Sequence, residues 1–332
     1  RRQRQMCIRD RSWWYFNLYR AFGGVPIAHK VVSPADAKTI RRCTDDEMYA
    51  LLTGDLAEAA RLLPASKGAE KARVTDIAAW TLLAKVYLTF GKPGEAKTAL
   101  EEAMKNPNYG LVNTTADAFN VKNKFNKEII FALYYNKAND TGHGYWYSTT
   151  KPEEAQLTQP APVFRALYDA RDNRLPLISE YTEDKKGTYL LNKWFDNRND
   201  ALKGNVVEND FPHLRYADVV LMYAEALAES GSSLGDALVW LNKTRTRAGL
   251  DALKAEDIPS KGAFIEALAD ERGREFALEG HRWFDLVRLG LALDRFHEMG
   301  YKLDAHNLLF PIPQNQIEIV NDKTILWQNP GY

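Results

Sequence analysis

Apolar residues recur at helical spacing over most of the chain, and helix start and stop signals divide this pattern into segments. An aromatic-rich segment at residues 13–22 ends at Gly23-Gly24, with Pro26 just beyond, which is typical of the end of a helix. The sequence Thr-Asp-Asp-Glu at residues 44–47 has the form of a capping box, and it starts a second helix that runs to about Leu63. The pattern therefore predicts long, well-delimited helices in this part of the chain.

Two predicted helix pairs match the pattern of a tetratricopeptide hairpin, in which small and apolar residues at fixed offsets let two helices pack closely. The pairs lie at residues 75–105 and 214–247. The matching positions are Trp80, Leu83, Ala84, Tyr87, Ala96, Leu100 and Ala103 in the first pair and Ala224, Leu227, Ala237 and Leu241 in the second. Because a solenoid needs about three consecutive repeats, we expect these separated pairs to pack on other parts of the chain.

Residues 106–212 have a different composition, rich in Asn, Asp, Gly, Thr, Tyr and Pro. The only strand candidates there are short runs at residues 128–135 and 188–195. Helical periodicity returns at residues 260–280 and continues through residues 281–288. We therefore predict a mostly α fold with tetratricopeptide-like helix pairs and a loop-rich, irregular region that contains few short strands.

Composition and charge exclude several classes of function. The chain has 332 residues, of which 45% are hydrophobic, and it contains no apolar run of about eighteen residues that could form a membrane-spanning helix. Lys plus Arg (44) equals Asp plus Glu (44), so the overall charge gives no reason to expect nucleic acid as a partner. The two cysteines, Cys7 and Cys43, are too few for a disulfide framework or a thiolate metal site.

Residues 1–11 differ sharply from the sequence that follows, because they contain five arginines and one aspartate. The peptide Met-Cys-Ile-Arg-Asp at residues 6–10 resembles translated adapter sequence at the end of an assembled contig. We therefore expect residues 1–11 to be a non-native leader and the native sequence to begin at Ser12.

Segments in the same order along nearly the whole chain resemble the SusD/RagB family of outer-membrane nutrient-binding lipoproteins. They are Tyr-Phe to Gly-Gly-Val-Pro at residues 15–26, the Arg-Tyr-Ala-Asp-Val helix at 214–227, the Arg-Ala-Gly turn at 241–250, the Glu-Gly-His-Arg-Trp-Phe-Asp element at 271–288, and Phe-Pro-Ile-Pro followed by Gln-Asn-Pro-Gly-Tyr at 309–332. Gly273 and Asn321-Asp322 depart from the family pattern. The prolines at 311 and 313 also predict an extended strap near the C-terminus, buried through Leu308, Leu309, Phe310 and Ile312.

The resemblance implies one SusD-like domain over residues 12–332 that is shorter at its N-terminus than other members. Its helical scaffold would comprise residues 12–105 and 213–332, and its loop-rich ligand region residues 106–212. It further implies an outward-facing outer-membrane lipoprotein, anchored by an N-terminal lipid that this chain does not include. Such a protein captures oligosaccharides for a partner TonB-dependent transporter of the SusC type, with no catalysis and no cofactor. The alternatives are a peptide-binding member of the same family and an intracellular, tetratricopeptide-type scaffold that binds peptides.

Two clusters of charged residues invite a catalytic or metal-binding interpretation, but their spacing favours a structural one. Arg215, Asp218, Met222, Glu225 and Glu229 fall on one face of an otherwise apolar helix. We expect these charges to form buried ion pairs that fix helix packing. The second cluster comprises Glu275, Glu279, His281, Arg282 and Asp285 and lacks the spacing of a metal site, so we expect a hydrogen-bonded structural network. No catalytic residue and no metal ligand is assigned.

The candidate ligand site is a ring cluster flanked by glycines. Three consecutive aromatic residues cannot all face one core, so at least one ring should face solvent or a cleft. An exposed ring can stack on a sugar while nearby polar groups bond its hydroxyls. The predicted ligand-binding residues are Asn139, His143, Tyr145, Trp146 and Tyr147, with Trp194 as a weaker candidate. The alternative is that two rings anchor the loop and the third has no role.

A glycoside hydrolase remains the third functional class to consider. Such an enzyme would need two carboxylates about 5–9.5 Å apart in the aromatic cleft. The nearest in sequence are Asp140, Glu153 and Glu154. We expect no hydrolase activity, and release of reducing ends by the purified protein would contradict this expectation.

Overall fold

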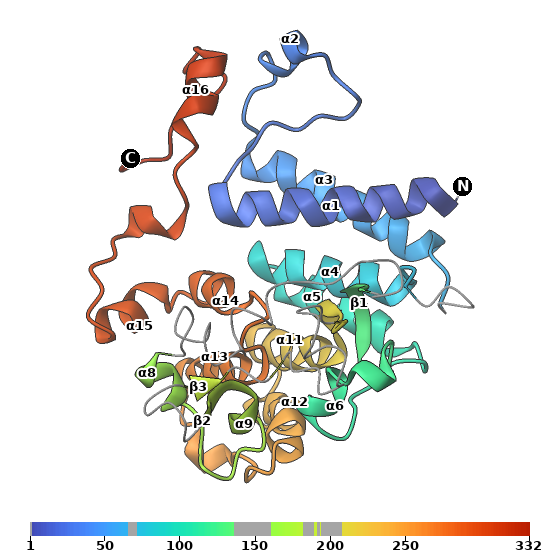
Figure 1. Cartoon of the computed structure of the whole chain (residues 1–332), viewed down its shortest axis with the longest axis vertical. Helices are drawn as coiled ribbons and strands as arrows, with labels where there is room; N and C mark the ends of the chain where they lie inside the picture. The colour runs from blue at the N-terminus through green and yellow to red at the C-terminus, as the bar shows by residue number, and fades with distance from the viewer. Residues whose placement is uncertain (1, 66–71, 136–160, 182–188, 191–192, 194–207) are drawn as a thin grey trace.

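The computed structural model describes residues 2–65, 72–135, 161–181, 189–190, 193 and 208–332, and helices account for most of them (Figure 1). The long helices pack one on the next to form the body of the molecule. In this packing order they are α1 (Arg2–Phe22), α3 (Asp45–Leu62), α4 (Asp76–Thr89), α5 (Pro93–Met104), α11 (Tyr216–Glu229), α12 (Leu234–Arg247) and α13 (Lys261–Glu275). None of the described helices is both long enough and apolar enough to cross a bilayer.

The predicted helix pairs are confirmed as α4–α5 and α11–α12, and the two pairs stack on each other through α5 and α11. Small residues make this close approach possible, because Ala96, Ala99 and Ala103 on α5 are all buried. The main apolar core lies between α3, α4, α5 and α11 and includes Leu52 and Ile77. Helix pairs separated by more than a hundred residues in the chain therefore form one continuous scaffold.

The ends of the first helices follow the predicted signals. Helix α1 ends at Phe22 before Gly23, whose φ of 72° favours glycine. Helix α3 begins with the predicted capping box, in which the Thr44 hydroxyl accepts from the backbone N–H of Glu47 and the Glu47 carboxylate accepts from that of Thr44. The start of α1 differs from the expectation, because the helix already begins at Arg2. The non-native origin of residues 1–11 stays a prediction.

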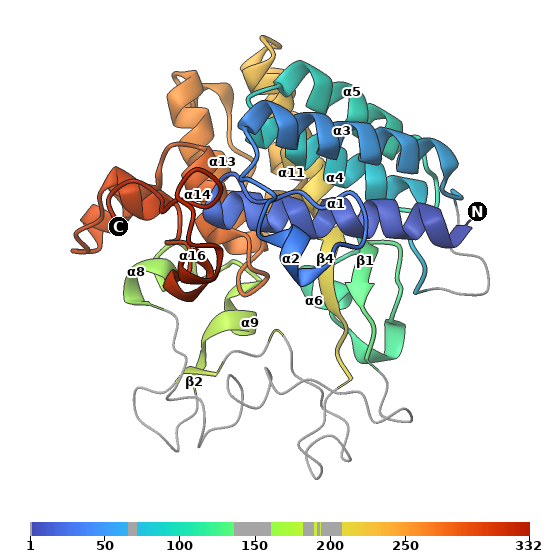
Figure 2. The same cartoon turned by 90° about the horizontal axis from the view of Figure 1, so that it is seen from above.

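Elements between the two helix pairs are short. Strand β1 (Ile129–Leu133) pairs antiparallel with β4 (Phe211–Arg215), which confirms the strand expected at residues 128–135. Figure 2 shows this two-stranded ribbon beside α1. A second two-stranded sheet joins β2 (Glu180–Tyr181) to β3 (Tyr189–Leu190). The other short elements are α2 (Pro34–Ala37), α6 (Thr115–Ala118), η1 (Val121–Asn123), α8 (Pro162–Arg165) and α9 (Leu175–Ser179).

The predicted continuous helix over residues 260–288 is wrong. Helix α13 ends at Glu275, and the chain then makes a turn in which Leu278 and Gly280 have φ values of 65° and 76°. Helix α14 (Arg282–Arg288) starts after that turn and is followed by α15 (Ala292–Glu298). The turn matters because it places Glu279 beside Arg215 and Lys193, and His281 against Phe276.

The C-terminal strap is held by hydrogen bonds more than by apolar burial. The Asn329 amide donates to the carbonyls of Phe22 and Phe310, and its oxygen accepts from Arg42 at 2.7 Å. Of the four apolar residues expected to be buried, only Ile312 is fully buried, whereas Phe310 is 47% exposed. The expectation of a buried strap is therefore correct for Ile312 and wrong for Phe310. Two further short helices in this part are η5 (Ala305–Leu308) and α16 (Gln314–Val320).

Candidate functional site

A buried network of ion pairs lies where β4 meets α13. Arg215, which is 1% exposed, donates to Glu128 at 2.8 Å, Glu275 at 2.6 Å and Glu279 at 2.8 Å. Burial alone would raise the pKa of Glu275, but Arg247, Arg215 and Arg174 outweigh it and hold that pKa well below its usual range. The predicted buried ion pairs are confirmed here, although Arg215 is the last residue of β4 rather than part of the helix face.

A second network joins α4, α11, α13 and α14. Asp218 contacts Lys85 at 2.5 Å and Arg272 at 2.9 Å, and Arg272 also bonds Asp285 at 2.8 Å. Arg288 bonds Asp285 at 3.0 Å and completes this cluster through Glu225. Glu229 departs from the prediction, because its pair with Lys261 is solvent-exposed. These contacts fix how the helices pack rather than forming a reactive acid pair.

The Glu275–Asp285 cluster is confirmed as a structural network. Its carboxylates are bonded to buried cations, and His281 stacks on Phe276 with ring centroids 4.6 Å apart. Arg282 donates to the carbonyl of Ala269, and a Cβ at Gly273 would lie 2.8 Å from Arg282 Nη1, so glycine at this position leaves room for that side chain. Within the described ranges, no group of three or more His, Cys, Asp or Glu residues is arranged to hold a metal ion.

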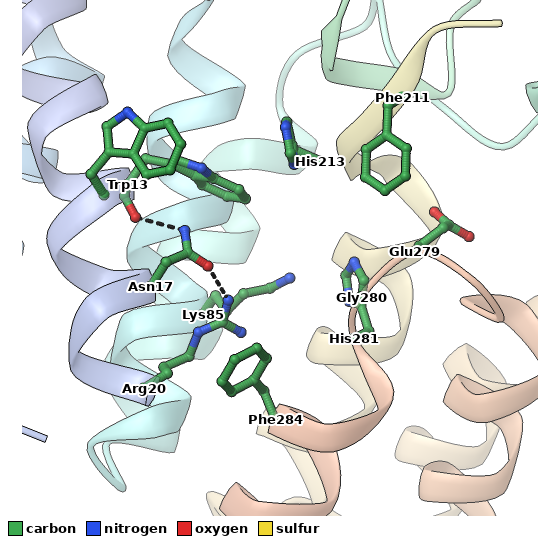
Figure 3. Close-up of a pocket in the computed structure, with 11 residues that line it drawn as sticks. Trp13, Asn17, Arg20, Lys85, Phe211, His213, Glu279, Gly280, His281 and Phe284 are labelled. Atoms are coloured by element: carbon green, nitrogen blue, oxygen red, sulfur yellow. Dashed lines mark hydrogen bonds between the residues drawn. The ribbon is translucent and has the colours of Figure 1, made fainter. Parts of the chain in front are cut away.

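A pocket of about 340 Å³ opens between α1, β4 and the turn before α14 (Figure 3). We call it the α1–α14 pocket. Its lining residues are Trp13, Trp14, Asn17 and Arg20 from α1, Lys85 from α4, Phe211 and His213 from β4, and Glu279, Gly280, His281 and Phe284 from the turn and α14. Figure 3 shows the α1 side chains facing those of β4 and α14 across the opening. Rings and charged groups thus meet in one concavity.

Rings around His213 define one wall of this pocket. Its imidazole lies 4.9 Å from the Trp13 ring and stacks on Phe131 at 5.8 Å. Burial, with the nearby charges of Arg9 and Lys85, lowers the pKa of His213 to about 4. Trp14 is 67% exposed, so its ring is available to a ligand.

Comparison with known proteins identifies the fold. The model of the SusD family matches residues 173–308, and a second model, described as starch-binding and associating with the outer membrane, matches residues 2–88. SusD-like protein P2 of Formosa agariphila is 26% identical over 97% of this chain and 72% of its own length. A SusD superfamily structure from Parabacteroides distasonis superposes with a TM-score of 0.83 at 24% identity, covering 99% of this chain and 78% of its own. The chain belongs to the SusD/RagB family.

Two other relatives of this SusD-family protein have names that state a ligand. A laminarin-binding SusD-like protein of known structure is 26% identical, with a TM-score of 0.78, and covers 99% of this chain and 78% of its own. The starch-binding protein SusD of Bacteroides thetaiotaomicron is 32% identical over 151 residues, which is 42% of this chain and 25% of that protein.

The ligand-binding residues expected from the sequence lie outside the described residues. They are Asn139, His143, Tyr145, Trp146, Tyr147 and Trp194. Tyr135, which precedes the first of these segments, contacts Asp210, which lies just after the last: the backbone N–H of Tyr135 donates to Asp210, and Lys124 bonds both residues. Phe211, the next residue, lines the α1–α14 pocket. The residues that flank these segments, Tyr135 and Asp210, therefore lie together at one end of the β1–β4 ribbon.

The α1–α14 pocket was missed by sequence reasoning. The signal was present, because Trp13 and Trp14 are adjacent on a helix and cannot both face the same core. The partners from β4 and α14 are hundreds of residues away in the chain, so sequence spacing could not have placed them opposite α1.

We expect the buried imidazole of His213 to make this SusD-family protein less stable in acid. Its folded pKa of about 4 lies below the unfolded value of about 6.5, so its contribution to stability is complete above about pH 6.5 and is lost as pH falls toward 4. The free energy of unfolding should fall between about pH 7 and pH 5 in the wild type. In His213→Phe we expect this fall to be smaller by about 1–2 kcal/mol. Urea denaturation at both pH values measures this change, and equal losses in the two proteins would contradict it.

Proposed function

We propose that this protein binds oligosaccharides at the cell surface and passes them to a TonB-dependent transporter of the SusC type, without a catalytic step. The observation that carries the proposal is the membership of the SusD/RagB family, together with relatives named for binding laminarin and starch. The charged clusters support binding over catalysis, because Glu275, Glu279 and Asp285 are bonded to buried cations rather than free to act as an acid or a base.

The proposed capture site is the ring cluster Tyr145-Trp146-Tyr147, with Asn139 and His143 as partners for sugar hydroxyls. Trp194 is a weaker contributor. Loops on a rigid scaffold are common positions for binding groups. The buried ion pairs of Arg215 join β4 to α13 and keep the base of these loops in place. Stacked rings spread over one surface suit a protein that must bind a polymer and then release it.

The proposed location is the outward face of the outer membrane, with a lipid on a segment N-terminal to this chain. The description of the model that matches residues 2–88 includes association with the outer membrane, which supports this location. We propose that the protein closes over its transporter partner once an oligosaccharide is bound.

Affinity electrophoresis on a panel of glycans that includes laminarin and starch tests the function and the site together. We expect at least one glycan to retard the wild-type protein, and Trp146→Ala to weaken that retardation at least about tenfold because a stacked ring is lost. Tyr301→Ala is the matched control, since Tyr301 is an aromatic residue that is 59% exposed, and it follows α15, away from the ring cluster in sequence.

The outcomes separate the two parts of the proposal. Unchanged retardation of Trp146→Ala would remove this loop from the site. If no glycan of the panel retards the wild-type protein, oligosaccharide binding itself is contradicted. If Tyr301→Ala loses as much retardation as Trp146→Ala, the loss reflects general destabilisation rather than a missing contact with the glycan.

A further inference from the structure

The charges beneath the α1–α14 pocket do not balance. The cluster that joins α1, α4, α11, α13 and α14 contains the cations Arg20, Lys85, Arg272 and Arg288 and the anions Asp218, Glu225 and Asp285. Four cations against three anions leave one positive charge in excess. A buried cation without a counter-ion is costly, so this cluster favours an anion that enters from outside.

Arg20 lines the pocket and places this excess positive charge at its wall. Its guanidinium lies 4.0 Å from the centroid of the Phe284 ring and 4.5 Å from that of Phe16, and it donates to the side-chain oxygen of Asn17 at 2.5 Å. Its Nε atom is buried and has no hydrogen-bond partner among the described residues. Burial lowers the pKa of Arg20 to about 10, so the group stays charged at neutral pH.

The other polar groups of the pocket do not neutralise Arg20. Lys85 is only 6% exposed, and its carboxylate partner, Asp218, is shared with Arg272. Among the described residues that line the pocket, Glu279 is the one carboxylate, and its two oxygens bond Arg215 and Lys193. His281 has a pKa well below its usual range because it is buried, so it is a neutral group here.

The remaining lining is aromatic and suits a sugar ring. Trp14 is largely exposed, and Trp13, Phe211 and Phe284 form apolar walls on the other sides. The pocket volume, about 340 Å³, falls within the range of about 300–1,000 Å³ that small-ligand sites occupy. Aromatic faces around a single unneutralised guanidinium match a ring that carries a negative group.

We propose that the α1–α14 pocket is a second subsite that binds a sugar ring bearing an anionic group, either a uronate carboxylate or a sulfate ester. The guanidinium of Arg20 bonds the anion, and Trp14 stacks on the sugar. This inference rests on the proposed function, because it assigns an acidic class of ligand to a protein that binds oligosaccharides.

Isothermal titration calorimetry with three defined oligosaccharides tests the subsite. They are trigalacturonic acid for the carboxylate, a sulfated carrageenan tetrasaccharide for the sulfate ester, and laminarihexaose as the neutral probe. We expect at least one acidic probe to bind the wild-type protein, and this affinity to fall as ionic strength rises from about 0.01 M to about 1 M, where the Debye length shrinks from about 30 Å to about 3 Å. Binding of a neutral probe should not change with salt.

Variants locate the binding. Arg20→Gln should weaken the acidic probe at least about tenfold, which corresponds to about 1.4 kcal/mol, whereas Arg20→Lys should retain part of the affinity because it keeps the charge. Trp14→Ala should also weaken it, and this exposed side chain can be removed with little effect on folding. The matched control is Arg61→Gln, because Arg61 is an exposed arginine on α3 that pairs with Glu58.

The results separate this subsite from the proposed function. Acidic probes that bind no better than the neutral one, or that bind Arg20→Gln and Trp14→Ala as tightly as the wild type, would overturn the subsite while neutral oligosaccharide binding stands. Binding of one acidic probe but not the other would support the subsite and identify its anion. Absence of binding by all three probes would overturn the subsite, whereas the proposed function is judged separately by the glycan panel and the ring-cluster variant.

Discussion

Replacing Arg215 with leucine is expected to lower the free energy of unfolding by about 3–5 kcal/mol. Arg215 is the only residue described here that bonds Glu128, Glu275 and Glu279 together, and all three carboxylates are buried. Leucine fills much of the space but leaves these charges without their shared partner, and an uncompensated buried charge costs more than the pair contributes. Urea denaturation followed by circular dichroism measures the change.

Two further variants make the Arg215 result interpretable. Arg215→Lys keeps the charge but loses the planar fork that reaches several carboxylates, so we expect an intermediate loss. Arg61→Leu removes an exposed arginine and its surface pair, which should cost no more than about 1 kcal/mol. If Arg215→Leu unfolds within about 1 kcal/mol of the wild type, the network is not what joins β4 to α13.

Substituting Gly24 with alanine is expected to destabilise the protein by about 1–3 kcal/mol. A Cβ at this position would lie 2.1 Å from the carbonyl oxygen of Cys43, and a backbone atom cannot move aside as a flexible side chain can. The same stretch is crossed by an isolated bridge between Pro26 and Arg42. Glycine in the Gly-Gly-Val-Pro segment is therefore required for the close approach of two backbones.

Gly54→Ala provides a control of opposite sign. Gly54 lies in the exposed middle of α3, and no atom is within 4 Å of the position its Cβ would take. Alanine there should stabilise the helix by about 0.5–1 kcal/mol. Thermal unfolding measures the change in Tm of each variant. Equal shifts in Tm for Gly24→Ala and Gly54→Ala would contradict the steric explanation.

Local signals in the sequence were sufficient for much of the scaffold. The capping box at Thr44 and the glycine at the end of α1 act over a few residues, so they can be recognised without a structure. Charges on the apolar helix α11 indicated buried ion pairs for the same reason. Their partners could not be predicted, because Lys85 and Arg272 reach Asp218 from distant parts of the chain.

Expectations failed where contacts through space outweigh local pattern. The helical periodicity of residues 260–288 continues across the break after Glu275, but the turn there lets Glu279 reach Arg215 and Lys193. The exposed ring of Phe310 has a similar cause, because the strap is held by the side chains of Asn329 and Gln328. Neither arrangement is encoded in the spacing of apolar residues.

The α1–α14 pocket likewise could not be predicted from the spacing of residues in the sequence. The adjacent tryptophans on α1 could have indicated an exposed ring but were not used, and only the fold shows that Phe284, Arg20 and His213 meet them in one concavity (Figure 3). The ring cluster at residues 145–147 stays a prediction, and its role depends on binding measurements.

Saturation-transfer difference NMR of this chain with laminarihexaose, maltohexaose and an acidic oligosaccharide tests the central claim most directly. The account predicts transfer of magnetisation to the ring protons of at least one of these sugars, strongest on the face that stacks on aromatic side chains, and a weaker signal in Trp146→Ala. Absence of transfer to every sugar at millimolar concentration, from a protein shown to be folded, would contradict the claim that this scaffold exists to capture glycans.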